Sequence, residues 1–453
     1  MTSAIAETDR VLTGLLGQRL VTRERDDFTA IAAVTYAADD LEPALIAQPE
    51  SVRDVQEIVR TAARTGIPFA VRGRGHSFAR HGTVAGGLVM DLRRMDACRI
   101  DADGRVGRAS ASTTTGAYTM AAAAMHLATG FGDHPDVGVP GLLLGGGIGY
   151  LSRRDGLTID ALIDAQLVLA DGSVVRAAAN ENEDLFWGLR GGGGNFGVVT
   201  SLSMRLEHTP MVTGGLVVFE ASGATVAALF EAGLHAPDAL SLMINVTRGP
   251  RAPFLPEQFH GRPIVTAIMC HSGNPEEAAA ALAPVRAAGK VIVDNIKVGP
   301  YPALFALAAD QAGTRTVRRT GFLDSISEDD ANSALELVAA APTEVALVNL
   351  RPMGGAIARV DTGATAFAHR DRGAIATIRS IDHDPAKVIE GAEWADRTAA
   401  LLRIGGAANV NFLGGDIENG AALAYPPQTL TRLREIKSRY DGDNLFRSNH
   451  NIG

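Results

Sequence analysis

The sequence predicts an α+β protein with two domains, and three observations lead to this prediction. The chain has 453 residues, more than one hydrophobic core usually supports. Its first half is rich in glycine and alternates short strands with helices. After Pro210 the glycine-rich loops become fewer, and strands such as 263–269 alternate with alanine-rich helices such as 275–288. This change of pattern predicts a second domain over residues 208–404, with 1–207 and 405–453 outside it.

The composition restricts the classes of function. Hydrophobic residues make up 46% and charged residues 21%, which is typical of a soluble globular protein. The net charge of -9 and the lack of a Lys/Arg cluster argue against a nucleic-acid partner. Residues 1–25 carry acidic side chains and no long apolar run, so we expect no secretory signal, no membrane span and a cytoplasmic location. The sequence leaves open whether copies of the chain form a homo-oligomer.

The two cysteines are far apart in apolar surroundings. Cys98 and Cys270 are therefore expected as free thiols rather than as a disulfide. The sequence has no Cys-x-x-Cys, so it predicts no zinc or iron–sulfur site.

The clearest local pattern near the N-terminus is a capped helix. Ser51 with Asp54 three residues later resembles a capping box, apolar residues then recur at helical spacing, and Gly66 is placed to end the helix. Residues 67–71 read as a short strand, followed by a tight loop, and 87–92 read as another strand.

Five further elements are expected. An alanine-rich helix covers 114–127, and two strands at 166–170 and 173–176 are joined by a hairpin turn at Asp171-Gly172. The β pattern continues over 198–206. A C-terminal helix is expected over 429–440, because Leu430, Leu433 and Ile436 share one side.

Three glycine-rich segments need a functional explanation: 71–77, 145–151 and 191–197. Glycine lets the backbone approach a ligand closely, so that its N–H groups can surround a phosphate. Each segment alone is as consistent with an ordinary turn. All three within about 125 residues favour a dinucleotide that lies along the domain.

The segment 192–197 matches the Rossmann pattern G-x-G-x-x-G, but its context is reversed. A Rossmann loop follows a strand and opens a helix. Here a helical run over 184–189 comes before the glycines, and Val198-Val199-Thr200 follows them. An NAD-binding Rossmann domain is therefore not expected.

Several long motifs in fixed order resemble the berberine-bridge-enzyme-like branch of the vanillyl-alcohol-oxidase superfamily of FAD-linked oxidases. The stretches that carry the resemblance are 71–78, 134–157, 185–200, 365–370 and 440–452. The resemblance implies a PCMH-type FAD-binding domain over 1–207, a substrate domain over 208–404 with a helix-covered antiparallel sheet, and a return of 405–453 to the FAD domain. The active site would lie between the two domains.

In such proteins the loop that matches 72–77 surrounds the FAD diphosphate, and its histidine bonds to the flavin 8α-methyl. This role falls on His76, whose ring is neutral and nucleophilic near pH 7. The residues that the resemblance assigns to the cofactor are Arg72, Gly73, Arg74, Gly75, His76, Ser77, Val137, Gly138, Gly141, Gly146, Gly147, Gly149, Tyr150, Leu151, Gly194, Asn195, Gly197, Val199, Asn449 and Asn451.

Three departures from the family pattern refine this expectation. Arg74 stands where many relatives have glycine, and its guanidinium either contacts a phosphate or points to solvent. His134 occupies the position of the cysteine that bonds flavin in doubly linked relatives, so a single covalent link is expected. Val137 matches a position where a small side chain is associated with oxygen access, which implies an oxidase.

The catalytic base is not evident. Relatives place a Glu or Gln on the strand after His369-Arg370, a pair that we expect to be structural, but 374–380 contains no carboxylate. Other relatives use a tyrosine at the position of Phe412. The remaining candidates are His134, which would handle a proton or pack against the flavin, together with Tyr425 and Asn411. Tyr150 and Arg351 are further candidates for lining the cavity.

The reaction implied is hydride transfer from a small organic substrate, an amine or a hydroxyl C–H, to flavin N5. Oxygen would then accept the electrons and give hydrogen peroxide. The missing base favours an amine or a self-activating phenol or enol. Two alternatives stay open: a tailoring oxidase of a secondary metabolite or sugar, and a flavin-binding homologue without turnover.

Overall fold

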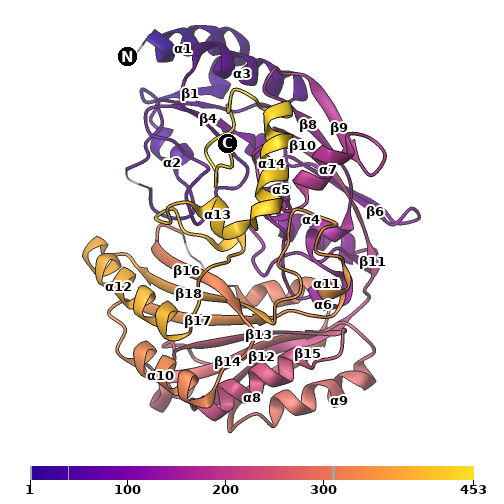
Figure 1. Ribbon diagram of the computed structural model, residues 1–453, viewed down its shortest axis with the longest axis vertical. Helices are drawn as coiled ribbons and strands as arrows, with labels where there is room; N and C mark the ends of the chain where they lie inside the picture. The colour runs from indigo at the N-terminus through magenta and orange to yellow at the C-terminus, as the bar shows by residue number, and fades with distance from the viewer. Residues whose placement is uncertain (1–2, 39, 309–311) are drawn as a thin grey trace.

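The computed structural model describes residues 3–38, 40–308 and 312–453. It arranges them in two layered parts that follow each other along the long axis (Figure 1). The upper part holds three sheets from the N-terminal half, and the lower part holds one seven-stranded sheet. The C-terminal segment crosses back to the upper part. Within the described ranges, no helix is both long enough and apolar enough to span a bilayer.

A four-stranded sheet of order β1-β2-β4-β3 forms the N-terminal end of the upper part. Strands β2, β3 and β4 are parallel, and β1 is antiparallel to β2. The strands are β1 (Leu20–Thr22), β2 (Leu45–Ala47), β3 (Phe69–Arg72) and β4 (Leu88–Asp91). The helices beside them are α1 (Ser3–Leu16), α2 (Phe28–Ala32) and α3 (Val52–Thr65).

Helix α3 begins and ends where the sequence predicts. The Asp54 N–H donates a 3.1 Å hydrogen bond to Ser51 Oγ, and Gly66 ends the helix with φ 64°. Its apolar stripe, which includes Ile58 and Val59, is buried against the sheet. The strands expected at 67–71 and 87–92 are confirmed with shorter bounds as β3 and β4.

A five-stranded antiparallel sheet of order β5-β6-β10-β8-β9 follows. Its strands are β5 (Cys98–Asp101), β6 (Val106–Ser110), β8 (Leu162–Val168), β9 (Val174–Ala178) and β10 (Val198–Arg205). The helices of this region are α4 (Thr115–Ala123), α5 (Val139–Leu144), α6 (Ser152–Asp155) and α7 (Glu183–Leu189). The hairpin predicted at Asp171-Gly172 is confirmed by the pairing of β8 with β9.

The helix predicted over 114–127 is too long. Helix α4 ends at Ala123, and His126 has φ 59°, a left-handed conformation that cannot continue a helix. Leu127–Ala128 instead form strand β7, which pairs with β11 (Glu207–His208).

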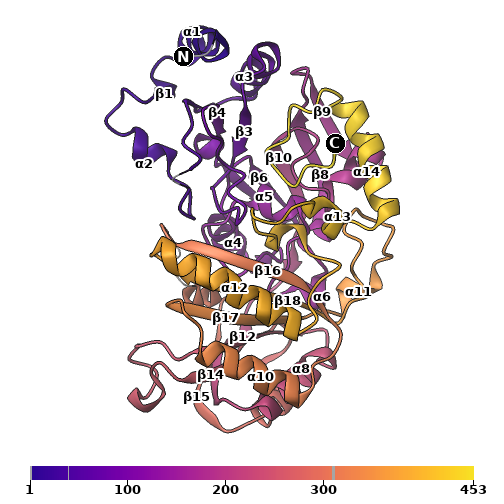
Figure 2. The same ribbon diagram turned by 60° about the vertical axis from the view of Figure 1, so that its left-hand side comes forward.

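The lower part is an antiparallel sheet of order β15-β12-β14-β13-β17-β18-β16, as the resemblance implies. Its strands are β12 (Val212–Glu220), β13 (Leu240–Arg248), β14 (Pro263–His271), β15 (Val291–Gly299), β16 (Arg315–Leu323), β17 (Val345–Pro352) and β18 (Ala374–Asp382). Its helices are α8 (Gly223–Leu234), α9 (Pro275–Arg286), α10 (Glu328–Ala339), α11 (Ala356–Arg359) and α12 (Pro385–Leu401). Figure 2 shows α8, α10 and α12 beside these strands, away from the N-terminal helices.

Side chains of the seven-stranded sheet alternate between two environments. Ile244, Val348 and Ala376 belong to the apolar core that the helices cover. Their neighbours Asn349 and Thr377 lie on the opposite face, toward the upper part. One face of the sheet is therefore an ordinary core. The other, called the polar face below, carries these polar side chains together with apolar ones.

The C-terminal segment, with α13 (Gly420–Ala424) and α14 (Pro427–Tyr440), packs against the upper part. Helix α14 confirms the helix expected over 429–440. Lys437 Nζ is buried and donates hydrogen bonds to the carbonyl of Asn195 at 3.0 Å and to Asp441 at 2.6 Å. Ser448 Oγ donates to the carbonyl of His81 at 3.0 Å. The tail thus contacts the third glycine-rich segment and His81, four residues after the first segment. The domain limits at 207/208 and 404/405 stay predictions.

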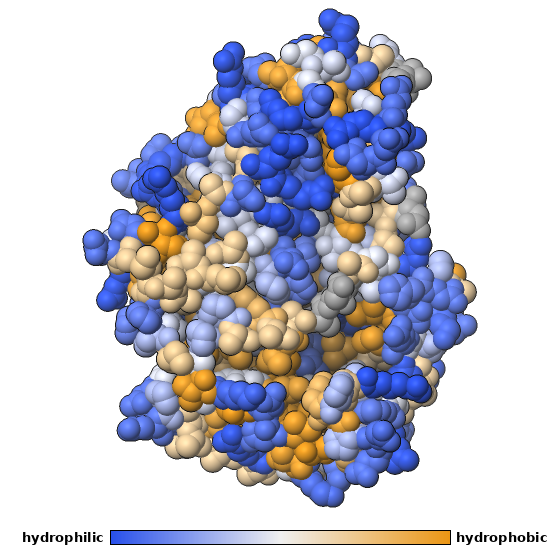
Figure 3. Space-filling model, turned by 180° about the vertical axis from the view of Figure 1, so that it is seen from behind, coloured by the Kyte–Doolittle hydropathy of each residue, from blue (hydrophilic) through white to orange (hydrophobic). Residues whose placement is uncertain are grey.

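The reverse face of the molecule is mainly hydrophilic in its upper half, and more apolar residues appear in its lower half (Figure 3). Val298 of the edge strand β15 is an example of an exposed apolar side chain in the lower part, at 53% exposure. Both cysteines are free thiols, as predicted, and burial raises the pKa of Cys270 to about 12.

Candidate functional site

The loop 73–77 leaves the end of β3 and packs on the segment that begins α5. Gly138 lies against this loop, since a Cβ there would be 3.4 Å from Arg74 Cγ, an ordinary contact distance. Gly75 has φ +74°, which favours glycine, and lies against Val34. The loop thereby brings His76 next to the segment 133–139.

His76 and His134 face each other, with ring centroids 5.1 Å apart and planes inclined by 51°. Burial lowers the pKa of His76 to about 4, and the nearby His134 and Arg74 add to this shift. The imidazole of His76 is therefore neutral at pH 7, with a free lone pair for bonding to carbon. His134 Nδ1 accepts a 3.2 Å hydrogen bond from the N–H of Asp136, which fixes its orientation.

The two arginines of this loop are held by the protein itself. Arg72 is fully buried and donates to the carbonyls of Ala32 and Ile31 at 2.8 Å and to Asp91 at 3.1 Å. Its side chain thus supports the loop from beneath. Arg74 Nε donates to the carbonyl of Ser112 at 2.6 Å, so its guanidinium is engaged on the protein side.

The third glycine-rich segment is bonded to the end of helix α5, one residue before the second segment begins. The N–H groups of Gly191 and Gly193 both donate to the carbonyl of Leu144, at 3.1 Å and 2.9 Å. The third segment lies between helix α7 and strand β10, which confirms the reversed order that argued against a Rossmann loop.

The glycines expected at the cofactor serve two purposes. A Cβ at Gly147 would overlap Thr158, and one at Gly149 would overlap the carbonyl of Phe131, so these two glycines permit tight packing. Gly197 would likewise press a Cβ against the Val168 carbonyl, at 2.8 Å. Gly141 and Gly194 have no atom within 4 Å of a built Cβ, so a ligand could approach their backbone.

Several buried polar atoms around these loops have no hydrogen-bond partner: Ser112 Oγ, Asn195 Oδ1, Asn449 Oδ1 and His450 Nε2. Buried polar atoms are normally satisfied, so the unpaired ones indicate where a polar ligand belongs. They come from sequence-distant segments and surround the glycine-rich loops, as an elongated cofactor such as FAD requires. The residues present therefore fit FAD.

The C-terminal tail contributes Asn449 directly to this surface. Its Nδ2 donates to the carbonyl of Gly194 at 3.2 Å. Asn451 instead pairs with Asn444 in both directions, at 2.9 Å and 3.4 Å, and shapes the tail. Among the other residues expected at the cofactor, Tyr150, Leu151 and Val199 are buried in the core.

The polar face of the seven-stranded sheet meets the loops at Asp133. Arg351 Nη2 donates to Asp133 at 2.7 Å, and its guanidinium carbon lies 5.3 Å from the ring centroid of Phe412. Burial favours a raised pKa for Asp133, but the charge and hydrogen bond of Arg351 outweigh it and hold that pKa below its usual value. An ionised carboxylate therefore stands one residue from His134.

A chain of hydrogen bonds extends from Arg351 across three strands. Arg351 Nε donates to Asn349 Oδ1 at 2.9 Å, Asn349 Nδ2 to Asn245 Oδ1 at 2.6 Å, and Asn245 Nδ2 to Thr266 Oγ1 at 3.1 Å. Beside its Asp133 end is a cavity of about 20 Å³, lined also by Tyr150 and Met243. The chain fixes the guanidinium that faces the loops.

The three catalytic candidates, His134, Asn411 and Tyr425, lie in different environments. His134 adjoins His76 as described. Asn411 Nδ2 donates to the carbonyl of Leu142 at 2.7 Å, and its side chain lies against Gly145. Tyr425 is buried and its hydroxyl donates to the carbonyl of Gly191 at 3.1 Å, a bond that stabilises the third loop. Catalytic roles for the three stay predictions.

His369 and Arg370 have structural partners, as expected. Arg370 is fully buried and forms two hydrogen bonds to the Asp160 carboxylate, at 2.9 Å and 2.7 Å. A nitrogen of His369 lies 3.0 Å from the carbonyl of Ala424.

The sequence analysis missed Asp133 and two residues of the sheet face, Arg318 and Arg379. The guanidinium carbon of Arg318 lies 3.1 Å from the ring centroid of Phe78, two residues after His76. Phe78 in turn stacks on Phe412, with centroids 6.3 Å apart. Alternation along the strands could have placed these arginines on one face, but only the strand register shows that they meet.

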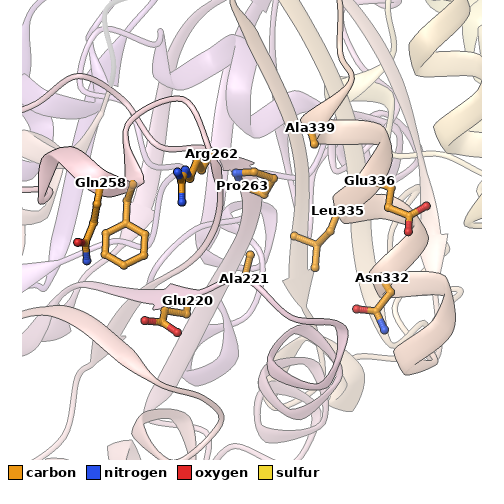
Figure 4. Close-up of a pocket in the computed structure, with 10 residues that line it drawn as sticks. Glu220, Ala221, Gln258, Arg262, Pro263, Asn332, Leu335, Glu336 and Ala339 are labelled. Atoms are coloured by element: carbon orange, nitrogen blue, oxygen red, sulfur yellow. The ribbon is translucent and has the colours of Figure 1, made fainter.

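A wider pocket of about 850 Å³ lies elsewhere, on the lower part. Figure 4 shows Arg262 and Gln258 on one side of it, and Asn332 and Glu336 of α10 on the other. None of the residues discussed above lines it, so it is separate from the candidate site.

Comparisons with known protein families agree with this geometry. Residues 43–178 match the FAD binding domain family, and residues 408–453 match the berberine and berberine-like family. These two regions contain His76, His134 and the C-terminal tail.

The chain also resembles individual proteins along nearly its whole length. It is 30% identical to (R)-6-hydroxynicotine oxidase of Paenarthrobacter nicotinovorans, with 94% of each chain covered. It is 26% identical to the FAD-linked oxidoreductase YgaK of Bacillus subtilis, with 96% of each covered.

Solved structures show the same fold. The crystal structure of 6-hydroxy-D-nicotine oxidase from Arthrobacter nicotinovorans superimposes with a TM-score of 0.84 and 27% identity, covering 96% of this chain and 97% of that one. A berberine-bridge-enzyme-like protein from Arabidopsis thaliana gives a TM-score of 0.86 at 21% identity, with 98% and 99% covered.

Proposed function

The chain belongs to the berberine-bridge-enzyme-like family of FAD-linked oxidases, and we propose that it holds its FAD by one covalent bond, from His76 to the flavin 8α-methyl. The observation that carries this proposal is the neutral ring of His76, which its loop holds beside His134 with 5.1 Å between the ring centroids. A neutral imidazole has the lone pair that bond formation needs. His134 stands where doubly linked relatives have a cysteine, which supports a single link.

When bound, FAD supplies the hydride acceptor at N5 and passes the electrons on to oxygen, which gives hydrogen peroxide. The glycine-rich loops and the tail would hold the cofactor through backbone N–H groups and the unpaired side chains of Ser112, Asn195 and Asn449. The sheet face would hold the substrate. His134 would accept or supply a proton close to the reacting carbon.

The substrate proposed is a small amine, or an alcohol, phenol or enol that loses its proton readily. The support is the environment of the site: its ionised carboxylate, Asp133, is already paired with Arg351 and is a weak base. A neutral amine can lose hydride without a dedicated carboxylate base. Val137, half-buried between Asp136 and Gly138, is the position proposed to admit oxygen.

Acid precipitation of protein expressed with ample riboflavin tests the link. We expect a yellow pellet and an intact mass raised by one FAD. A colourless pellet from protein that still binds FAD would contradict the covalent bond alone, and protein without any FAD would contradict the function as well.

Turnover is tested with the flavin-loaded protein. Anaerobic additions of amines, sugars and phenols should bleach the flavin with at least one compound class, and air should restore the colour with release of peroxide. Failure of every class to bleach the flavin would favour a flavin-binding protein without turnover.

A further inference from the structure

Helix α4 has an outer side that is apolar although it faces solvent. The sequence from 109 to 125 contains no charged residue. Ala117, Met120 and Ala124 recur at helical spacing and are exposed. Met120 exposes 66% of its surface, and Met125, which follows the helix, exposes 54%. A surface helix normally carries polar residues on its outer side, so an apolar outer side is typical of an interaction site.

The 3₁₀-helix η5 (Tyr301–Leu307) packs against α4 and extends this apolar side. The segment 298–308 contains no charged residue either. Pro300, Ala303 and Ala306 are exposed, and they lie on one side of η5, because a 3₁₀-helix has three residues per turn. Figure 3 shows apolar residues gathered across the middle of the reverse face, at the height of α4 in Figure 1. The α4–η5 surface consists of Met120, Met125, Pro300, Ala303 and Ala306.

An acidic and a basic side chain flank this surface on different sides. Glu207 lies beside α4, because β11 pairs with β7 and β7 packs against α4. Lys297 lies on the side of η5: it is directly opposite Gly214, and a Cβ on Gly214 would lie 3.1 Å from Leu304 of η5. Both charged side chains are exposed, and neither forms an ion pair within the described part of the chain. The acid therefore flanks one helix of the surface and the base flanks the other.

We propose that a second copy of this chain covers the α4–η5 surface, related by a two-fold axis that sets α4 of one copy on η5 of the other. Glu207 of each copy then meets Lys297 of the other, so the surface is complementary to itself in charge. The small alanines leave room for the flexible methionines. A membrane is a poorer match, because membrane-binding helices carry Lys and Arg beside their apolar side, and α4 carries none. The inference does not depend on the proposed function.

Sedimentation equilibrium of the flavin-loaded protein measures the dissociation constant of the dimer, with Met120→Glu as the first variant. Each dimer would then bury two unpaired carboxylates, so the dissociation constant should rise at least about 30-fold. Ile389→Glu is the matched control, because Ile389 on α12 is 70% exposed and lies outside the α4–η5 surface. It should leave the dissociation constant within about twofold of the wild-type value. Equal Tm values for both variants and the wild type check that all three are folded.

Exchange of the two flanking charges tests the symmetry. Glu207→Lys and Lys297→Glu should each weaken the dimer about tenfold, because like charges then meet on both sides of the axis. The double variant should restore the wild-type dissociation constant. A mixture of the two single variants should form mixed dimers, in which opposite charges meet again at both contacts. Only a contact between two copies of this chain predicts both kinds of rescue.

Wild-type protein that stays monomeric at about 0.1 mM would overturn the inference, as would equal dissociation constants for Met120→Glu and the wild type. Dimers that neither charge variant weakens would overturn the arrangement of α4 on η5. Monomeric protein that binds phosphatidylserine vesicles, and loses this binding in Met120→Glu, would assign the surface to a membrane and also overturn the inference. Protein that never binds FAD would remove the proposed function, while sedimentation would still decide on the dimer.

Discussion

The glycine-rich loops and the polar face of the seven-stranded sheet meet at one site, yet they present different groups. The loops present backbone, amide oxygens and a neutral His76, drawn from segments that each carry a local sequence motif. The sheet presents Arg318, Arg351 and Arg379, one from each of three strands. The loop side therefore suits a cofactor, and the sheet side suits a substrate.

The largest effect expected on this comparison comes from His76→Ala. If the loops alone attach the cofactor, this variant should lose all acid-stable flavin, while His134→Gln should keep it. Intact mass and the colour of the acid precipitate measure both. Residual covalent flavin in His76→Ala would show that the attachment site lies elsewhere.

The next prediction concerns the ion pair between Arg370 and Asp160. Arg370→Met leaves the buried Asp160 carboxylate without its guanidinium, which should lower the free energy of unfolding by about 3–5 kcal/mol. Denaturant unfolding measures this loss. Arg372→Met is the control two residues away, since its pair with Asp324 is partly exposed and should contribute less than about 1 kcal/mol. Equal losses in the two variants would contradict a special role for the buried pair.

Acid should weaken the loop side, where the C-terminal tail docks. The rings of His81 and His450 lie 4.7 Å apart, and burial lowers their pKa values to about 3 and about 4 from the usual 6.5. The unfolded chain then binds more protons than the folded one below pH 6.5, so stability is full above that pH and falls toward pH 4. Each of the two rings should contribute a loss of the order of 3 kcal/mol.

Denaturant unfolding at several pH values measures this loss, and His81→Asn should flatten the profile. A profile that is flat in the wild type between pH 6.5 and 4 would contradict buried neutral rings at the tail.

The smallest expected effect distinguishes a structural role of Tyr425 from a catalytic one. Tyr425→Phe removes one buried hydrogen bond to Gly191 and should lower the free energy of unfolding by about 1 kcal/mol, with kcat within about twofold of wild type. Steady-state kinetics with any substrate that bleaches the flavin measures kcat. A fall in kcat of about 100-fold or more would instead assign Tyr425 to proton transfer.

The sequence predicts the loop side well because its information is local. The cap at Ser51, the hairpin at Asp171-Gly172 and the reversed order around 191–197 each depend on adjacent residues, and all three are confirmed. The extent of α4 is wrong because the alanines continue past the left-handed turn at His126, which the tertiary fold imposes.

The sheet side is harder to predict from the sequence, because its contacts join residues that are far apart along the chain. Whether Arg318 meets Arg379 depends on the register of two strands with α10, β17 and α11 between them along the chain. A shift of one residue would turn one of them to the other face. The pairing of Asp133 with Arg351 likewise joins the two parts of the molecule, and no local sequence pattern predicts it.

The hydrogen-bonded row from Arg351 through Asn349 and Asn245 to Thr266 has a consequence for attempts to alter selectivity. These hydrogen bonds restrict the movement of the Arg351 guanidinium on β17. The row begins at Thr266 on β14, two strands away. A change at Thr266, two strands away from Arg351, would release Asn245 and so loosen the orientation of Arg351. Directed evolution of this oxidase should therefore find useful substitutions well outside the lining of its active site.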